Sequence, residues 1–152
     1  MTIIKHALTG HDISDTQLDP SIQALTLSDI RTPDAPLVYV NRGFEKMTGY
    51  ERGEVIGRNC RFLQGPDTSS DAVAQMRAAI AGGAPLIVDV FNYRKNGTPF
   101  WNRLSLTPVK DPSGRATHYI GIQSDITRMR YLQERLHSIA LDFATAEKHV
   151  LG

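Results

Sequence analysis

The sequence has a single cysteine, Cys60, among its 152 residues. One thiol excludes any internal disulfide and any metal site built from several cysteines, so we expect no bound metal. No apolar run approaches the roughly 18 residues that a membrane-spanning helix needs. Lys5 and His6 interrupt the N-terminal stretch in which a signal peptide would carry its apolar core. These absences predict a soluble, cytoplasmic protein without a membrane partner.

An excess of charge of one sign is missing as well. The 17 Lys and Arg residues and 16 Asp and Glu residues leave a formal net charge of +1, and no block of like charge occurs. The broad positive field that favours nucleic-acid binding is therefore absent, and we expect no nucleic-acid partner. The hydrophobic content of 41% excludes a disordered chain. Length and composition together predict one domain with an appended helix.

Alternating apolar residues predict five strands, separated by segments rich in Gly, Pro, Asn and Asp. The strands are expected over residues 24–28, 37–40, 86–93, 100–109 and 117–124. Asn96-Gly97 predicts the turn between the third and fourth strands, and Asp-Pro-Ser-Gly at 111–114 predicts the next turn. Two strands, small helices and then three antiparallel strands indicate an α+β fold. We expect a five-stranded antiparallel sheet with short helices on one face.

Helices are predicted between and after these strands. Short helical pieces are expected from residue 42 to about 63, where glycines limit their length, and a longer helix is expected over 71–81. Ser69 or Ser70 would cap that helix, and Gly82-Gly83 would end it. The predicted organisation is an N-terminal extension or cap over 1–22, a core over 23–125 and a C-terminal helix over 126–152. Both ends of the chain would thus flank the core with helical segments.

The cysteine lies in the segment 57–65, Gly-Arg-Asn-Cys-Arg-Phe-Leu-Gln-Gly, which places polar groups on both sides of the thiol. A cysteine that is only a small core residue needs no such neighbours. The segment resembles the flavin-binding cysteine motif of light-oxygen-voltage (LOV) domains, a branch of the PAS superfamily. The resemblance runs from about residue 24 to 127 and includes Asn92-Tyr93, Phe100-Trp101-Asn102 and Gly121-Ile122-Gln123. The short flanks resemble the bacterial short LOV group.

The resemblance implies the PAS/LOV fold and a blue-light photoreceptor that binds FMN noncovalently. In that family, blue light drives the cysteine sulfur onto flavin carbon C4a, and the bond breaks again in the dark. Cys60 is thereby implied as the photoreactive nucleophile. The resemblance also implies a sensor that is not an enzyme.

No histidine has a sequence-based claim to act as a base for Cys60. A reaction that begins from an excited flavin needs no such base, whereas a Cys–His hydrolase does, so the hydrolase is disfavoured. The histidines are scattered, and each is expected at the surface: His6, His11, His118, His137 and His149.

The resemblance also implies roles for the polar residues near the phosphate and ribityl chain. Arg61 and Arg77 match residues that bind the terminal phosphate, which suits the fork of a guanidinium group. Because Arg61 needs a terminal phosphate, FMN is expected rather than riboflavin or FAD. Asn59 and Gln64 match residues that hydrogen-bond the ribityl chain.

The isoalloxazine ring would be contacted by amides and apolar side chains. Asn92 and Asn102 match the residues at the pyrimidine edge, where an amide offers both a donor and an acceptor. Gln123 matches the residue near flavin N5 and O4, and its amide could reorient when N5 gains a proton, as a first switching step. The other residues expected to line the flavin are Leu63, Ile80, Val90, Leu104, Leu106 and Gly121.

The two asparagines also constrain the register of their hairpin. If Asn92 and Asn102 lie opposite each other on one face, the turn is centred on Gly97. A bare two-residue Asn96-Gly97 turn would send one amide to the other face. We therefore predict a longer loop or a bulge, with Gly97 at positive φ.

The outer face of the sheet and the last helix are both expected to expose apolar residues. Alternation sends five of them to the outer face: Ile87, Phe91, Trp101, Ile120 and Ile122. In the helix, seven residues follow a 3-4 spacing: Met129, Leu132, Leu136, Ile139, Phe143, Ala146 and Val150. Such a seam predicts a homodimer through the terminal helices and the outer face. The alternative is one amphipathic helix packed on its own sheet.

Two other functions compete with the photoreceptor. One is a flavin-dependent redox sensor or enzyme on the same fold, in which Cys60 would be idle. The other is a PAS module that binds a different small molecule or only dimerises. For the photoreceptor, we expect the signal to pass from Gln123 through the terminal helices to a dimer interface or partner. The sequence does not identify a downstream signalling partner.

Overall fold

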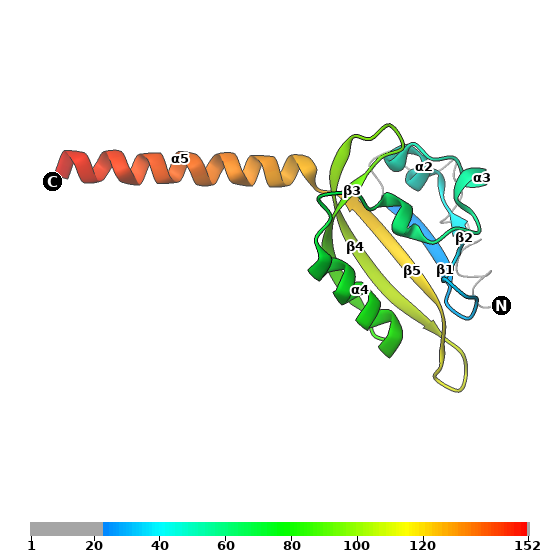
Figure 1. Cartoon of the computed structure of the whole chain (residues 1–152). Coiled ribbons are helices and arrows are strands. Elements are labelled where there is room, and N and C mark those ends of the chain that lie inside the picture. Colours follow the sequence, from blue (N-terminus) through cyan, green and yellow to red (C-terminus); the bar gives the residue numbers. More distant parts are fainter. Residues whose placement is uncertain (1–22, 152) are drawn as a thin grey trace.

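The computed structural model describes residues 23–151, which form one antiparallel sheet with helices around it (Figure 1). The order across the sheet is β2-β1-β5-β4-β3, so the last strand of the chain lies at the centre. The strands are β1 (Ala24–Asp29), β2 (Leu37–Val40), β3 (Leu86–Tyr93), β4 (Pro99–Lys110) and β5 (Ala116–Asp125). The predicted α+β fold and its five strands are confirmed. The extension expected over 1–22 lies outside the described residues.

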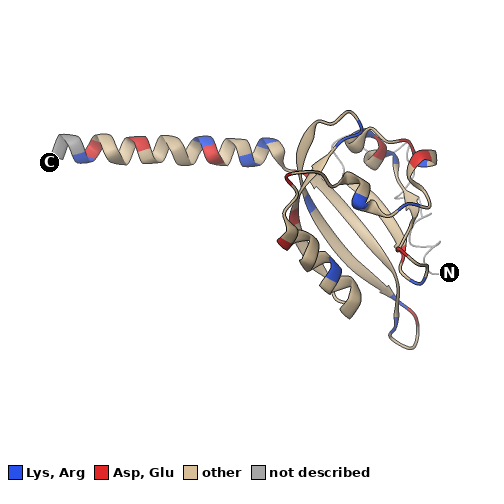
Figure 2. Cartoon of the chain, in the orientation of Figure 1, with Lys and Arg blue, Asp and Glu red and all other residues tan. Residues whose placement is uncertain are grey.

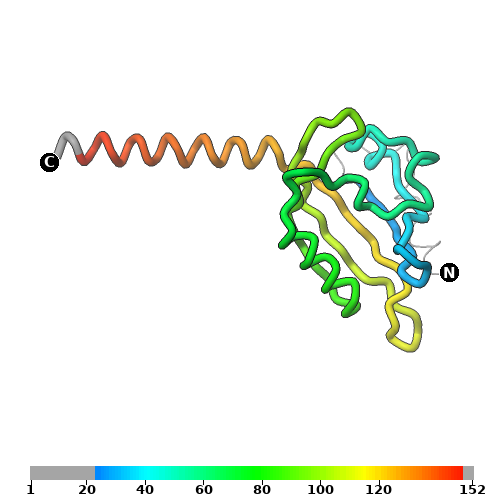
Figure 3. Tube along the Cα trace, in the orientation of Figure 1, coloured from blue at the N-terminus to red at the C-terminus, as the bar shows by residue number. Residues whose placement is uncertain are grey.

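Four short helices cover one face of the sheet, as the traces in Figures 1 and 3 show. They are α2 (Arg42–Thr48), α3 (Arg52–Val55), the 3-10 helix η2 (Cys60–Leu63) and α4 (Ser70–Gly82). The Ser69 side chain accepts from the Ala72 amide at 3.4 Å and so caps α4, as predicted. Gly83 follows α4 with a φ of +63°, a conformation that glycine adopts at low cost. The helix signals in the sequence are therefore confirmed.

Two clusters of buried side chains join the helices to the sheet. The larger cluster contains Ala24, Leu37, Val40, Phe44, Val55 and Leu63. The second joins α4 to β3 through Ala72, Val88 and Val90. Each large apolar side chain buried in this way contributes about 1.5–3 kcal/mol. The clusters hold η2 and α4 against the inner face of the sheet.

The β3–β4 hairpin corrects the predicted register. Asn92 pairs with Phe100 and Asn102 pairs with Val90, so the two asparagines do not lie opposite each other. They still share the inner face, because the offset between them is an even number of residues. Asn102 Nδ2 donates to Asn92 Oδ1 at 3.0 Å across this diagonal.

The loop of this hairpin is longer than two residues, as predicted. Arg94 N donates to Thr98 O at 2.9 Å and closes a loop of three residues between them. Gly97 has a φ of +87°, in agreement with the prediction. A three-residue loop whose last position is left-handed is common in hairpins, and it produces the observed register.

His118 is buried and does not lie at the surface, contrary to the prediction. It belongs to β5, the central strand, and its side chain is 1% exposed. Its Nδ1 lies 2.9 Å from Thr117 Oγ1, and its Nε2 lies 3.7 Å from Asp29 Oδ2. Burial lowers the pKa of the imidazole and so favours the neutral ring. His6 and His11 lie outside the described residues.

The last helix, α5 (Thr127–Leu151), extends away from the domain (Figure 1). Apolar side chains of the expected seam are exposed along it: Met129, Leu132, Leu136, Ile139 and Phe143. The alternative in which this helix packs along its own sheet is therefore wrong. Charged residues are interspersed along the helix (Figure 2). Among the described helices, none is both long and apolar enough to cross a membrane.

The start of α5 contacts the outer face of the sheet. The Arg130 guanidinium carbon lies 3.8 Å from the centre of the Trp101 ring, and Arg130 Nη1 lies 3.6 Å from Asp89 Oδ2. The outer-face residues Phe91, Trp101, Ile120 and Ile122 are half-buried, whereas Ile87 is 70% exposed. An exposed apolar area thus remains at the edge strand β3.

Candidate cofactor site

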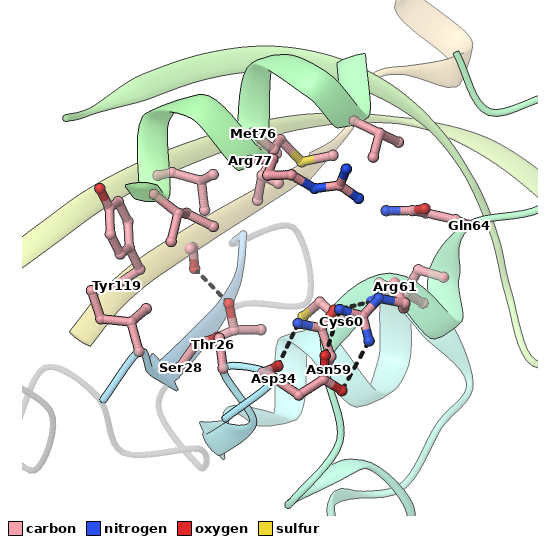
Figure 4. Close-up of a pocket in the computed structure, with 18 of the residues that line it drawn as sticks. Thr26, Ser28, Asp34, Asn59, Cys60, Arg61, Gln64, Met76, Arg77 and Tyr119 are labelled. Carbon is pink, nitrogen blue, oxygen red and sulfur yellow. Dashed lines mark hydrogen bonds and ion pairs between the residues drawn. The ribbon is translucent and has the colours of Figure 1, made fainter. Parts of the chain in front are cut away.

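A cavity of about 700 Å³ lies between the inner face of the sheet and the helices η2 and α4 (Figure 4). Its volume is in the range of small-molecule sites. All residues that the sequence singled out line it: Asn59, Cys60, Arg61, Leu63, Gln64, Arg77, Ile80, Val90, Asn92, Asn102, Leu104, Leu106, Gly121 and Gln123. The fold therefore brings together side chains from η2, α4 and three strands. Their roles toward a ligand remain predictions.

Cys60 is the first residue of η2 and lines this cavity. The preceding Asn59 caps the helix, because its Oδ1 accepts from the Arg61 amide at 2.9 Å. Burial raises the pKa of the Cys60 thiol from an ordinary value of 9.0 to about 12. The sulfur therefore keeps its proton at neutral pH. A thiol in that state is a poor nucleophile without activation, which argues against a Cys–His hydrolase.

Two buried amides on the inner face have oxygens without hydrogen-bond partners among the described residues. Asn102 is 2% exposed; its Nδ2 donates to Asn92, and its Oδ1 has no partner. Gln123 is 2% exposed; its Nε2 donates to Thr26 Oγ1 at 3.1 Å, and its Oε1 has no partner. An unpaired buried acceptor costs about 1–3 kcal/mol. Both side chains line the cavity, so a ligand with polar ring atoms would remove this cost.

These amides fit the polar edge of a flavin ring. That edge alternates C=O groups with N–H or bare nitrogen, and an amide can offer either its oxygen or its nitrogen after a half turn. Gly121 leaves space beside them, because a Cβ there would lie 2.5 Å from Thr26 Oγ1 and 3.0 Å from Gln123 Nε2. The residues present therefore fit an isoalloxazine ring in hydrogen-bonding capacity and in space.

Two arginines line the cavity, and they differ in their ion pairing. Arg61 forms a two-pronged ion pair with Asp34, in which Nη1 lies 2.9 Å from Oδ2 and Nη2 lies 2.6 Å from Oδ1. Arg77 makes no ion pair within residues 23–151, and Figure 4 shows its guanidinium pointing toward Gln64. One guanidinium is thus available for an anion, and the other is engaged by a carboxylate.

Further polar residues that the sequence did not single out line the cavity: Thr26, Ser28, Arg31, Thr32, Asp34 and Tyr119. Two of them contact residues that it did single out: Thr26 accepts a hydrogen bond from Gln123, and Asp34 pairs with Arg61. Alternation along β1 places Thr26 on the inner face, so the period-two pattern could have found it. Asp34 lies in an irregular loop between Pro33 and Pro36, where no periodic pattern indicates which side chain faces the cavity.

A family model supports the resemblance seen in the sequence. The model of the PAS domain matches residues 24–128. A solved structure described as the LOV domain of the Erythrobacter litoralis EL346 blue-light activated histidine kinase has a TM-score of 0.67 and 45% identity to this chain. The similarity covers 69% of this chain and 96% of that one. The sheet and its helices are therefore those of a known sensor domain.

Curated relatives extend the similarity to longer proteins. The chain is 45% identical over 131 residues to a blue-light-activated histidine kinase of Rhizobium johnstonii. The aligned region covers 84% of this chain and 38% of the kinase. It is 46% identical over 106 residues to phototropin-2 of Oryza sativa subsp. japonica, with 70% of this chain and 12% of the relative covered. The chain thus spans well under half the length of these curated relatives.

These relatives correct the expectation that separated this chain from enzymes. The Rhizobium johnstonii protein is named a histidine kinase, so its name combines a light stimulus with an enzymatic activity in one protein. The prediction of a sensor that is not an enzyme is therefore wrong, because the resemblance extends to a protein that is named as an enzyme. Similarity to a light-sensing segment does not set a chain apart from enzymes.

Proposed function

Because the chain belongs to the PAS family, and within it to the LOV branch, we propose that it is a blue-light sensor with FMN in the cavity described above. One observation carries the proposal: the unpartnered oxygen of Asn102, which can accept from a ring N–H, belongs to the same cavity as the protonated thiol of Cys60. The names of the relatives, which refer to blue light, support the stimulus.

Different residues of the cavity would bind different parts of FMN. Asn92 and Asn102 would hold the pyrimidine edge, and Arg77 would hold the phosphate together with Arg61. Asn59 already uses its side chain within the protein, since its Nδ2 donates to the Asp34 carbonyl at 2.7 Å and its Oδ1 accepts from the Arg61 amide. Its contact with the ribityl chain would therefore use the second lone pair of Oδ1.

FMN, when bound, would supply a ring that absorbs blue light and a carbon, C4a, that accepts a sulfur once the ring is excited. Cys60 would supply both the sulfur and the proton: its S–H bond would break, the sulfur would bond to C4a and the proton would go to N5. The reverse transfer in the dark would restore the thiol. Burial raises the pKa of this thiol to about 12, so the thiol itself carries the proton and no separate acid is needed.

Gln123 would respond to the new proton on N5. A bare N5 is an acceptor and pairs with the Nε2 side of the amide, whereas a protonated N5 is a donor and pairs with Oε1. The amide must therefore turn and exchange its contact with Thr26 Oγ1, to which Nε2 now donates at 3.1 Å. This turn is the proposed first step of signalling.

The turn of Gln123 would act on the joint that starts α5. Two residues further along β5, Asp125 Oδ1 accepts from the Thr127 amide at 3.0 Å, and Asp125 Oδ2 pairs with Arg94 Nη2 at 2.7 Å. Thr127 Oγ1 in turn accepts from the Trp101 amide at 2.8 Å. A shift of β5 would therefore change the direction in which α5 leaves the sheet.

The proposed receiver of this change is a homodimer formed through α5. At 1.5 Å per residue, this 25-residue helix is about 38 Å long, which exceeds what one small domain needs for packing. Leu136 and Phe143 of its seam are 66% and 70% exposed. A second copy of the helix would cover them, and the outer sheet face around Ile87 would extend the contact. A downstream partner would then respond to the geometry of the dimer.

Absorption spectroscopy tests the light reaction directly. We expect protein reconstituted with FMN to absorb blue light with vibronic structure, to lose that band on illumination and to regain it in darkness. Cys60→Ala should bind FMN and fluoresce without bleaching. Met76→Leu is the matched control, because it removes a sulfur that also lines the cavity but carries no proton; it should still bleach.

Other outcomes of that experiment would contradict the proposal. Failure to bind any flavin would favour a PAS module for another ligand. A bound flavin that ignores light but changes with a chemical reductant would favour a redox sensor. Bleaching that survives in Cys60→Ala would remove the cysteine from the mechanism.

A further inference from the structure

The ion pair between Arg61 and Asp34 engages the guanidinium in the way that a phosphate would. Its two contacts run between separate nitrogens and separate oxygens, at 2.9 and 2.6 Å. A guanidinium fork binds a carboxylate or a phosphate in this same parallel geometry. Within the described residues, Asp34 is the ion-pair partner of Arg61, so an incoming phosphate competes with a carboxylate already in place.

The loop that carries Asp34 is fixed in an unusual backbone conformation. Asp34 has a φ of +71° and Ala35 has a φ of +44°, and non-glycine residues rarely adopt such values. Asn59 Nδ2 donates to the Asp34 carbonyl at 2.7 Å, so the backbone of the loop is tied to the cap of η2. Asp34 and Asn59 both line the cavity. Asp34 is therefore held beside Arg61 by contacts that do not depend on its carboxylate.

The two ends of the proposed phosphate site differ in net charge as a result. Arg77 has no ion-pair partner among residues 23–151, whereas Arg61 and Asp34 together are neutral. A phosphate that approaches Arg61 loses part of the attraction, because the carboxylate repels it and because the ion pair must open. The side chains of Arg61 and Asp34 are 58% and 61% exposed, so solvent screens this penalty and keeps it modest.

We propose that Asp34 is a specificity-determining residue of the cofactor site, which lowers the preference for a phosphorylated flavin by competing with its phosphate for Arg61. The inference rests on the proposed flavin function and deepens it. It concerns the phosphate end of the ligand alone. Riboflavin, which has the same ring and ribityl chain without the phosphate, should be insensitive to Asp34.

Titration calorimetry of the flavin-free protein with FMN and with riboflavin, at low ionic strength, separates these ligands. We expect Asp34→Asn to raise the affinity for FMN by roughly three- to tenfold and to leave riboflavin within about twofold. Asparagine tolerates a positive φ, so the loop should keep its shape. Asp142→Asn, an equal change of charge on the exposed part of α5, should alter neither affinity. Added salt should reduce the gain for FMN, because it screens exposed charges.

An Arg61→Ala background provides the second arm. We expect the gain from Asp34→Asn to be smaller there, since no ion pair has to open and only the repulsion between the carboxylate and the phosphate is left. The inference is overturned if both flavins change equally, if the FMN affinity does not rise, or if the gain is as large without Arg61. Light-driven bleaching of the wild type is the independent check: where it occurs and Asp34→Asn has no effect, this inference alone fails. If neither flavin binds, the proposed function fails with it.

Discussion

The two faces of the sheet differ in where their unpaired polar atoms lie. Within the described residues, the unpaired oxygens of the inner face line a cavity, whereas His118 Nε2 and Arg130 Nε on the outer side do not. On the inner face, buried amides have unused oxygens, as in Asn102 and Gln123. On the outer face, Asp89 is saturated: Arg103 Nε and Nη2 donate to it at 2.9 and 3.2 Å, and Arg130 approaches from α5. Unpaired polar groups are costly unless something else completes them, whereas paired ones stabilise the fold by themselves.

This difference indicates two kinds of partner for one sheet. The inner face is suited to a small molecule with polar atoms, because its unpaired amide oxygens line a cavity. The outer face and α5 present apolar side chains with paired charges among them, a surface suited to another protein. Under the proposed function, the inner face would thus hold the site that detects light, and the outer face with α5 would form the surface that transmits the signal.

The largest expected effect concerns assembly. The double substitution Leu136→Glu and Ile139→Glu puts two charges into the proposed seam of α5, and we expect it to convert a dimer into a monomer. Light scattering should show the mass halved while bleaching by light is unchanged. Leu141→Glu is the matched control, because Leu141 is 55% exposed but lies off the seam. A wild-type monomer, or a variant that stays dimeric, would contradict the role of α5.

The next effect belongs to the inner face. Asn102→Leu removes an amide proposed to hold the ring edge, and we expect at least a tenfold loss of FMN affinity. The flavin-free protein should unfold within about 1 kcal/mol of the wild type, because one unpaired acceptor is removed while another, on Asn92, is created. Calorimetry and denaturant unfolding give the two values. A large loss of stability with unchanged affinity would mean that this amide serves the fold.

A smaller and opposite pattern is expected on the outer face. Asp89→Asn weakens the ion pairs to Arg103 and Arg130, and we expect the free energy of unfolding to fall by about 1 kcal/mol. FMN affinity should not change, since neither arginine lines the cavity. Together with Asn102→Leu, this variant tests whether the two faces are energetically separate. Any clear loss of flavin affinity would show that they are coupled.

The smallest expected effect is that of pH on bleaching, which should be absent near neutrality. Because the pKa of Cys60 is raised to about 12, the thiol stays protonated, and the extent of bleaching should be flat between about pH 6 and 9. Stability should fall as pH rises from 9 toward 12, since the unfolded chain releases the thiol proton first. Cys60→Ala should remove this part of the alkaline loss. Bleaching that titrates near neutrality would indicate a thiolate in the dark state.

The fold was predictable because its signals are local. Alternation and turn residues gave the strands, and Ser69 and Gly83 bound α4 by the interactions expected of a cap and a terminator. The register of the β3–β4 hairpin was not predictable to the residue. Parity alone fixes which face a side chain takes, and the three-residue loop shifted the partner of Asn92 by two positions while keeping that face.

Parts of the site that depend on tertiary contacts escaped the sequence. His118 was predicted at the surface, but the strand order places it on the central strand, where neighbours on both sides bury it. The pairing of Asp34 with Arg61 joins residues that are 27 positions apart through an irregular loop. Neither a period nor a motif reports such a contact, because it depends on how the loop folds back over η2.

In the proposed light reaction, the sulfur of Cys60 gives up its hydrogen in light and regains it in darkness. Since the chain has one cysteine and its thiol is protonated, an infrared difference spectrum contains a single S–H stretching band to follow. We predict that this band disappears when the FMN-loaded protein is illuminated with blue light and returns at the rate at which the flavin colour recovers. An S–H band that persists unchanged while the flavin bleaches would contradict the account.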